Sequence, residues 1–217
     1  MPQFSELELS GRIDAEHFFP EYEFLRENAP SSAKFIMLGS ELTYCQRGKQ
    51  PIYTRHGLPV VNSKHVQPNR VSVEDCKKAM PNPFSVSNIK TSDLLLNGTG
   101  IGTIGRAAPY MENTDAIPDN HVTIIRTRTL DLVYLSVFLN SQIGQAQVRK
   151  HQRGSSGQIE LYPRDIARFE VWEATESVQK EIRQLIVNVR EARTRSRLLL
   201  EEAKARVEEL IDQAVKS

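Results

Sequence analysis

The densest cationic segment of the chain runs from residue 149 to residue 156. It holds three fixed cations, a histidine, a glutamine and two serines, and no acidic residue. Cations of this kind bind DNA phosphates, whereas Arg and Gln side chains can each make two hydrogen bonds to one base. The residues that this pattern predicts at a DNA interface are Arg149, Lys150, Gln152, Arg153, Ser155 and Ser156. The alternative is a positively charged helix end that the helix dipole favours.

Three other loops combine cations with amide side chains, within residues 46–50, 54–56 and 62–70. Loops held on a rigid scaffold are common sites of recognition. The residues expected to contact DNA from these loops are Lys49, Arg55, Lys64 and Arg70. The alternative is that loop cations only keep the protein soluble. The net charge of +1, from 28 Lys and Arg against 27 Asp and Glu, does not by itself indicate a nucleic-acid partner.

A glycine-rich segment matches the dinucleotide-binding pattern G-x-G-x-x-G at Gly100, Gly102 and Gly105. That chemistry needs a helix to begin at the glycines, so that its first amide groups hold a pyrophosphate. Pro109 would fall in the second turn of such a helix, where it removes a hydrogen bond and clashes with the preceding turn. The segment therefore favours a β-hairpin or a bulged strand pair. An enzyme that uses a nucleotide here is the alternative hypothesis.

The remaining residues offer no catalytic or metal-binding pattern. The five histidines lack metal-ligand spacing, and no Ser-His-Asp arrangement follows from their order. Cys45 and Cys76 lie far apart and are interpreted as structural residues in a reducing compartment. No apolar run approaches the ~20 residues of a membrane span, and the first residues lack a basic and apolar leader. We therefore expect a cytoplasmic protein, with no catalytic residue, metal or cofactor in this chain.

A mixed α+β domain over residues 1–174 is predicted to position these segments. A helix is expected to begin near Pro20, and short apolar runs between residues 35 and 73 predict strands joined by turns. The later predicted elements are a strand over residues 121–127, one helix over 132–151 that is weakest at Gly144, and a strand over 166–172.

Residues 175–217 predict one long coiled-coil helix that joins the chain to a partner. Neither Gly nor Pro occurs between residues 177 and 215, where Glu, Arg, Lys, Ala, Leu and Val dominate. An apolar seam recurs at alternating steps of four and three, with a single stutter near Ala203. The helix would be about 58 Å long, so most of it must extend past its own domain. The residues expected in a dimer interface are Ile182, Leu185, Val189, Leu199, Val207 and Leu210.

In its order of motifs the chain resembles the specificity subunit of a type I restriction-modification system. The motifs are Arg-Ile-Asp-Ala-Glu at 12–16, Leu-Gly at 38–39, the glycine-rich segment 98–106, the turn at 154–158 and the helix start at 179–182. Family members usually carry two target-recognition domains and two conserved helices. This chain therefore resembles a half-subunit with one of each. Residues 171–176 depart from the proline-rich lead-in that usually precedes the helix.

The resemblance implies a non-catalytic subunit that recognises double-stranded DNA and directs a partner adenine methyltransferase to a bipartite site. The partner modification subunit would use S-adenosylmethionine, and a restriction subunit would be a further partner. It also implies that two half-subunits form an antiparallel homodimer through the C-terminal helix. The alternative hypothesis is a coiled-coil adaptor whose globular domain binds protein.

Overall fold

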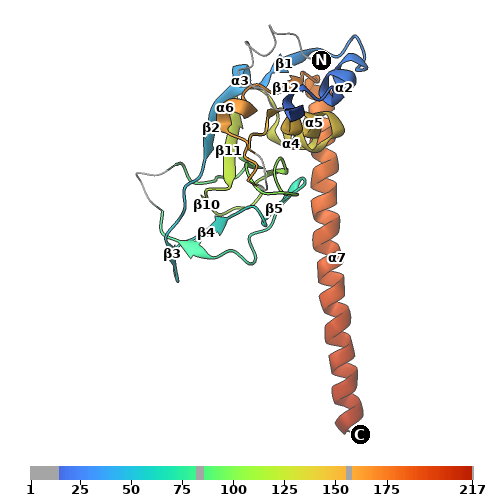
Figure 1. Cartoon of the computed structure of the whole chain (residues 1–217). Helices are drawn as coiled ribbons and strands as arrows, with labels where there is room; N and C mark the ends of the chain where they lie inside the picture. The colour runs from blue at the N-terminus through green and yellow to red at the C-terminus, as the bar shows by residue number, and fades with distance from the viewer. Residues whose placement is uncertain (1–14, 82–85, 155–157, 217) are drawn as a thin grey trace.

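The computed structural model describes residues 15–81, 86–154 and 158–216. An α+β domain is followed by the 41-residue helix α7 (Glu176–Lys216), which runs along one side of the domain and projects well beyond it (Figure 1). The fold class expected from the sequence is confirmed, and α7 has the predicted bounds to within one residue at each end.

The centre of the domain is an antiparallel sheet with the strand order β2-β11-β8-β9. Its strands are β2 (Leu42–Arg47), β11 (Val122–Thr127), β8 (Leu94–Asn97) and β9 (Ala107–Pro109). All four residues of β8 are buried. Because successive side chains of a strand point to opposite faces, Leu94 and Leu96 enter one core cluster and Leu95 enters the other. Both faces of the sheet are therefore covered.

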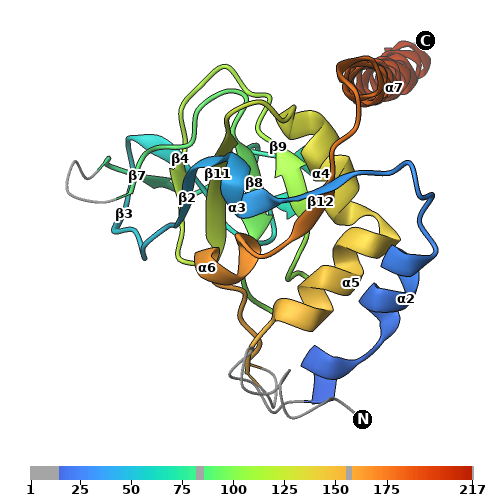
Figure 2. The same ribbon diagram turned by 90° about the horizontal axis from the view of Figure 1, so that it is seen from above.

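Helices cover the first face of the sheet. Helices α4 (Leu132–Asn140) and α5 (Gln142–His151) lie against it, while the 3-10 helix η1 (Ala15–Phe18) and helix α2 (Glu21–Glu27) pack on α5 (Figure 2). The prediction of one helix over 132–151 is wrong. Ser141 is extended, with φ −72° and ψ 169°, and its side chain caps α5. The break thus falls at this polar cap rather than at Gly144.

A second sheet with the order β10-β4-β7-β3 lies beyond the other face. Its strands are β10 (Ile117–Pro118), β4 (Leu58–Val61), β7 (Lys78–Ala79) and β3 (Tyr53–Thr54), beside the hairpin of β5 (Val66–Gln67) and β6 (Arg70–Val71). Residues of β4, β5 and β6 fill the second core cluster together with Leu95 and Ile124. We call residues 42–92, which include β2 of the central sheet, the basic lobe.

A short strand pair connects the domain to α7. Strand β1 (Phe35–Met37) pairs antiparallel with β12 (Glu170–Trp172), and the helices α3 (Leu38–Glu41) and α6 (Pro163–Ile166) lie beside them. The predicted strand over 166–172 is therefore shorter than expected. Tyr162 and Pro163 begin a helical turn in which the amide of Ile166 donates to the carbonyl of Tyr162, so the chain becomes extended only at Glu170.

Helix α7 is held to its own domain by its first turns and by three arginines. Val178 and Ile182 pack against the first core cluster. Arginines 183, 190 and 197, spaced seven residues apart, then form ion pairs with Asp131, Glu112 and Glu74 respectively. We call these three pairs the arginine ladder. Ile182, which was expected in the dimer interface, is partly buried against the domain, and its contact with a second helix stays a prediction.

The glycine-rich segment is the turn of the β8–β9 hairpin, as the favoured interpretation predicted. The amide of Gly105 donates to the carbonyl of Asn97, 2.8 Å away, and closes the turn. Gly105 has φ +79°, and a Cβ built there would lie 2.7 Å from the side chain of Val148 on α5. Gly102 has a similar φ of +75° but nothing within 4 Å of such a Cβ. Gly102 is therefore needed for its backbone conformation alone, whereas Gly105 is needed for its conformation and for close packing against Val148.

We expect Gly105→Ala to lower the free energy of unfolding by about 2–4 kcal/mol, because it combines backbone strain with overpacking of the stiff Val148 side chain. Gly102→Ala should cost only about 1 kcal/mol, since it carries the backbone strain alone. Urea denaturation of both variants measures the difference. Equal losses in the two variants would show that the contact with Val148 is unimportant.

Candidate nucleic-acid interface

Positive charge is concentrated in one part of the chain. Residues 42–92 hold eight Lys and Arg but only two Asp and Glu, a net charge of +6. The rest of the chain holds the remaining 20 Lys and Arg against 25 Asp and Glu, a net charge of −5. The net charge of +1 for the whole protein conceals this separation. The sign of the charge makes the basic lobe the candidate surface for a polyanion.

Two of the predicted DNA-binding residues, Lys49 and Arg55, lie on either side of β3 and are exposed. Neighbouring Lys77 and Lys78, which were not singled out from the sequence, are exposed as well. The Nζ of Lys77 lies 5.3 Å from the ring centroid of Tyr53. Within the described ranges none of these four cations forms an ion pair. Their charges are therefore available to a ligand.

The other two predicted loop residues, Lys64 and Arg70, are exposed near the β5–β6 hairpin. Asn69 in its turn adopts a left-handed conformation with φ +58°. The Oδ1 of Asn69 accepts hydrogen bonds from Asn140 Nδ2, at 2.8 Å, and from Ser136 Oγ, at 3.1 Å. These bonds to α4 hold the turn in place and so fix where Arg70 emerges.

The cluster predicted most strongly lies on the other side of the domain, on α5 (Figure 2). Arg149 makes two hydrogen bonds to Glu21, of 2.9 and 2.6 Å, and Lys150 pairs with Glu23. Both acids belong to α2, more than a hundred residues earlier in the sequence. The absence of acids within the segment was therefore a misleading signal, because the fold supplies them. Contact of these two cations with DNA stays a prediction.

Arg153 has a structural partner of its own. Its guanidinium forms two-pronged hydrogen bonds with Asp165, the shortest being 2.7 Å, and the Asp165 side chain is only 1% exposed. Burial alone would raise the pKa of Asp165, but the hydrogen bonds and charge of Arg153 outweigh it and hold the pKa below its usual range. Gln152 ends α5. Ser155 and Ser156 lie outside the described residues.

One hydroxyl and one imidazole group lie within hydrogen-bond distance among the described residues, but no carboxylate completes a catalytic relay with them. Thr99 Oγ1 and His121 Nδ1 are 2.6 Å apart, but Asp119 accepts from the backbone amide of His121 rather than from its ring. A relay of hydroxyl, imidazole and carboxylate is therefore not formed there. Among the same residues, no group of three or more His, Cys, Asp or Glu could hold a metal ion. None of the described helices is both long and apolar enough to cross a membrane.

The nucleotide hypothesis for the glycine-rich segment is not supported by its geometry. The segment leads into strand β9, whereas a pyrophosphate site of this kind needs the first amides of a helix.

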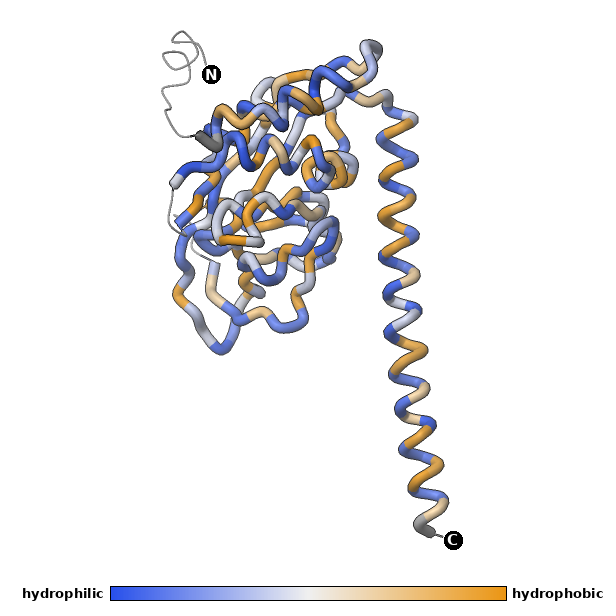
Figure 3. Tube along the Cα trace, turned by 45° about the vertical axis from the view of Figure 1, so that its right-hand side comes forward, coloured by the Kyte–Doolittle hydropathy of each residue, from blue (hydrophilic) through white to orange (hydrophobic). Residues whose placement is uncertain are grey.

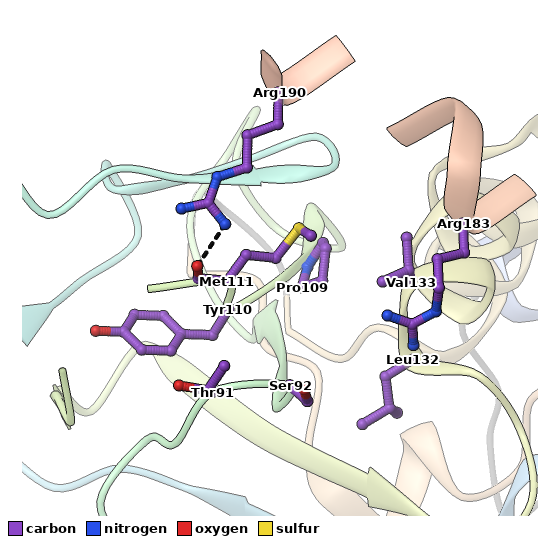
Figure 4. Close-up of a pocket in the computed structure, with 9 residues that line it drawn as sticks. All are labelled: Thr91, Ser92, Pro109, Tyr110, Met111, Leu132, Val133, Arg183 and Arg190. Carbon is purple, nitrogen blue, oxygen red and sulfur yellow. Dashed lines mark hydrogen bonds between the residues drawn. The ribbon is translucent and has the colours of Figure 1, made fainter. Parts of the chain in front are cut away.

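A cleft of about 130 Å³ lies between α7 and the domain (Figure 4). Arg183 and Arg190 both line it, beside Thr91, Ser92 and Tyr110. Arg183 is engaged by Asp131, while Arg190 donates to the carbonyl oxygen of Met111 and pairs with Glu112. The charge in this cleft therefore serves to attach the helix.

Comparison of the sequence with protein-family models and with curated proteins found no match. Among solved structures, one from work on complex assembly and conformational transition of the type I R-M system aligns with 90% of this chain, at 12% identity and a TM-score of 0.57. The chain has the fold of a type I restriction-modification protein. The fold expected from the sequence resemblance is thereby confirmed. The alignment covers 49% of that solved chain, so the present chain spans about half its length.

Two further solved structures align with most of this chain. The type IIG restriction endonuclease BpuSI aligns over 88% of it and over 30% of its own length, at 11% identity and a TM-score of 0.53. The HsdS subunit from Thermoanaerobacter tengcongensis aligns over 87% of it and over 48% of its own length, at 13% identity and a TM-score of 0.44.

We expect Arg153→Ala to lower the free energy of unfolding by about 3–5 kcal/mol at neutral pH, because it leaves the buried Asp165 carboxylate unpaired. Asp165 has a lowered pKa in the folded protein, so its ionised form stabilises the native state above the unfolded pKa of about 4. This contribution is lost as the pH falls through the folded pKa, and the variant should approach the wild type in acid.

Denaturant melts at pH 7 and pH 3.5 measure both effects. Asp165→Asn added to Arg153→Ala is the control, since removing the unpaired charge should recover part of the loss. An Arg153→Ala protein of unchanged stability that binds DNA more weakly would instead make Arg153 a DNA contact.

Proposed function

We propose that the chain is a non-catalytic DNA-recognition component of a restriction-modification system, and that its basic lobe binds duplex DNA. The observation that carries the proposal is the charge separation, +6 in residues 42–92 against −5 elsewhere. A surface with unpaired cations gains affinity for DNA by releasing counterions from the phosphates, whereas cations already paired with carboxylates gain little. Lys49, Arg55, Lys64 and Arg70 are therefore the better candidates than the α5 cluster.

The outer side of α7 is a second surface, and we propose that another helix packs on it. Apolar positions recur along this helix (Figure 3), and the exposed fractions of Leu185, Val189 and Leu199 are 53%, 44% and 55%. Val207 and Leu210 are exposed to similar extents, 55% and 49%. At 100° per residue this seam lies about 140° around the helix from the arginine ladder. A second helix can therefore pack on it without disturbing the domain.

Two copies joined antiparallel would present two basic lobes related by a twofold axis. Such a dimer would recognise an inverted repeat, with the gap between half-sites set by the length of α7. The chemistry would come from a partner methyltransferase that uses S-adenosylmethionine to methylate adenine, and a restriction subunit would complete the complex.

We expect Arg55→Ala to weaken binding to all DNA sequences and to lower the slope of log K against log salt by about one unit, because one phosphate contact is lost. Arg149→Ala is the matched control, since Glu21 already neutralises this exposed arginine, and its slope should be unchanged. Fluorescence anisotropy at several salt concentrations, with the methyltransferase present, measures both slopes. If only Arg149→Ala lowered the slope, the DNA interface would lie on α5 instead.

We expect Leu185→Glu with Leu199→Glu to give monomers, because two charges would be buried in each copy of the seam. Leu198→Glu is the control, since Leu198 is 63% exposed but lies about 100° away from the seam position Leu199. Sedimentation should show monomers only for the double variant, and mapped adenine methylation at inverted repeats should be lost with it. A dimeric double variant would contradict the proposed interface.

A further inference from the structure

The outer edge of the basic lobe is formed by β3 and β7, the last two strands of the four-stranded sheet, which we call the ribbon. Strand β3 is the edge strand and pairs with β7 in the register Tyr53↔Ala79 and Thr54↔Lys78, while β7 also pairs with β4 on its other side (Figure 2). Continuing this register by one residue places Ile52 opposite Met80. Because side chains alternate along a strand, Ile52 and Thr54 share a face with Lys78 and Met80.

This face is unusual because it exposes large apolar side chains. Ile52 is 86% exposed and Met80 is 63% exposed, while Thr54 and Lys78 beside them are also exposed. The opposite face carries Ala79, which is fully buried, and Tyr53, which is 41% exposed and whose ring lies beside the Nζ of Lys77. The ribbon is therefore anchored to the domain at Ala79, while the other face presents an apolar pair and a polar pair to solvent.

We infer that this face enters the major groove of DNA, where Ile52 and Met80 contact the methyl groups of thymine and Lys78 and Thr54 contact base acceptors. The inference rests on the proposed DNA-recognition function and deepens it. Strands of a β-ribbon or a β-sheet can enter the major groove, in which the thymine methyl is the apolar group on the base edges. Lys and Thr are suited to the neighbouring acceptors.

Charge complementarity selects DNA over a protein strand as the occupant of this surface. Lys49 and Arg55 flank β3, Lys77 and Lys78 lie at β7, and all four are exposed, whereas Asp119, the acid beside β10 that interacts with Tyr53, is buried. A protein strand added to the edge of β3 would pair with only two residues of backbone, which is a short template. The cations around the ribbon would instead lie close to the phosphates that line the groove.

Replacing thymine with deoxyuridine tests the contact, because it removes only the 5-methyl group. The duplexes would carry the inverted repeat found by methylation mapping, with each thymine replaced in turn, and Kd would be measured by anisotropy with the full-length chain. For the wild type, replacing a single sensitive thymine should weaken binding roughly fourfold, the equivalent of one buried methyl group of about 0.8 kcal/mol. In Ile52→Ala or Met80→Ala the same replacement should have no further effect.

The control is Phe24→Ala, a substitution of an equally exposed residue, 64%, on α2. This variant should respond to deoxyuridine as the wild type does, and unchanged thermal melting of all three variants verifies their folds. The inference is overturned if no thymine in a half-site responds to the replacement, or if the effect of deoxyuridine persists in both ribbon variants. Either result leaves the proposed DNA recognition intact. Ribbon variants that bind DNA normally but lose the methyltransferase would identify a protein surface. A wild type that binds no duplex contradicts the proposed function itself.

Discussion

Strand β8 must be covered on both faces, and this constraint determines the layout of the domain. Leu94 and Leu96 point into one cluster and Leu95 into the other. A buried strand with apolar residues on each side needs two layers of neighbouring structure. Helices α4 and α5 supply one layer, and the strands β4, β5 and β6 supply the other. The two groups of cations that the sequence contains therefore lie on opposite sides of the same sheet.

The acids of the chain decide which of these cations is available to a ligand. On the helical side, α2 contributes Glu21 and Glu23 to the cations of α5, and Asp165 is buried against Arg153. On the opposite side Glu74 pairs with Arg197 of α7, and Asp119, which follows β10, is buried. The cations on the helical side are thus paired with acids, whereas Lys49, Arg55, Lys77 and Lys78 form no ion pair among the described residues. Local density of cations is a poor guide to function when partners are distant in sequence.

The features that depend on local pattern could be predicted from the sequence. An uninterrupted run of helix formers with apolar residues at heptad spacing predicted α7, and Pro109 with three glycines predicted the β8–β9 turn. The features that depend on distant segments could not. Nothing near Arg149 indicates Glu21, and nothing near Ile182 indicates that the domain covers it. A signal for the basic lobe was nevertheless present, because 32 consecutive residues, 42–73, contain no acid. The net charge counted segment by segment would have indicated the basic lobe, whereas the net charge of +1 for the whole protein did not.

The two faces of helix α7 differ, because one carries the arginine ladder that contacts the domain and the other carries the exposed apolar seam. Each pair of the arginine ladder is partly or largely exposed and stabilises the attachment of α7 to the domain by at most about 1 kcal/mol. The three contacts of the ladder nevertheless extend over 14 residues, or about 21 Å of helix, and so define the direction of the rod relative to the domain. In the proposed dimer, the seam on the other side would define the direction of the rod relative to a second helix. A dimer built this way transmits the position of one basic lobe to the other through a rigid element. Recognition of two half-sites at a fixed separation requires such stiffness more than it requires tight contact at either end.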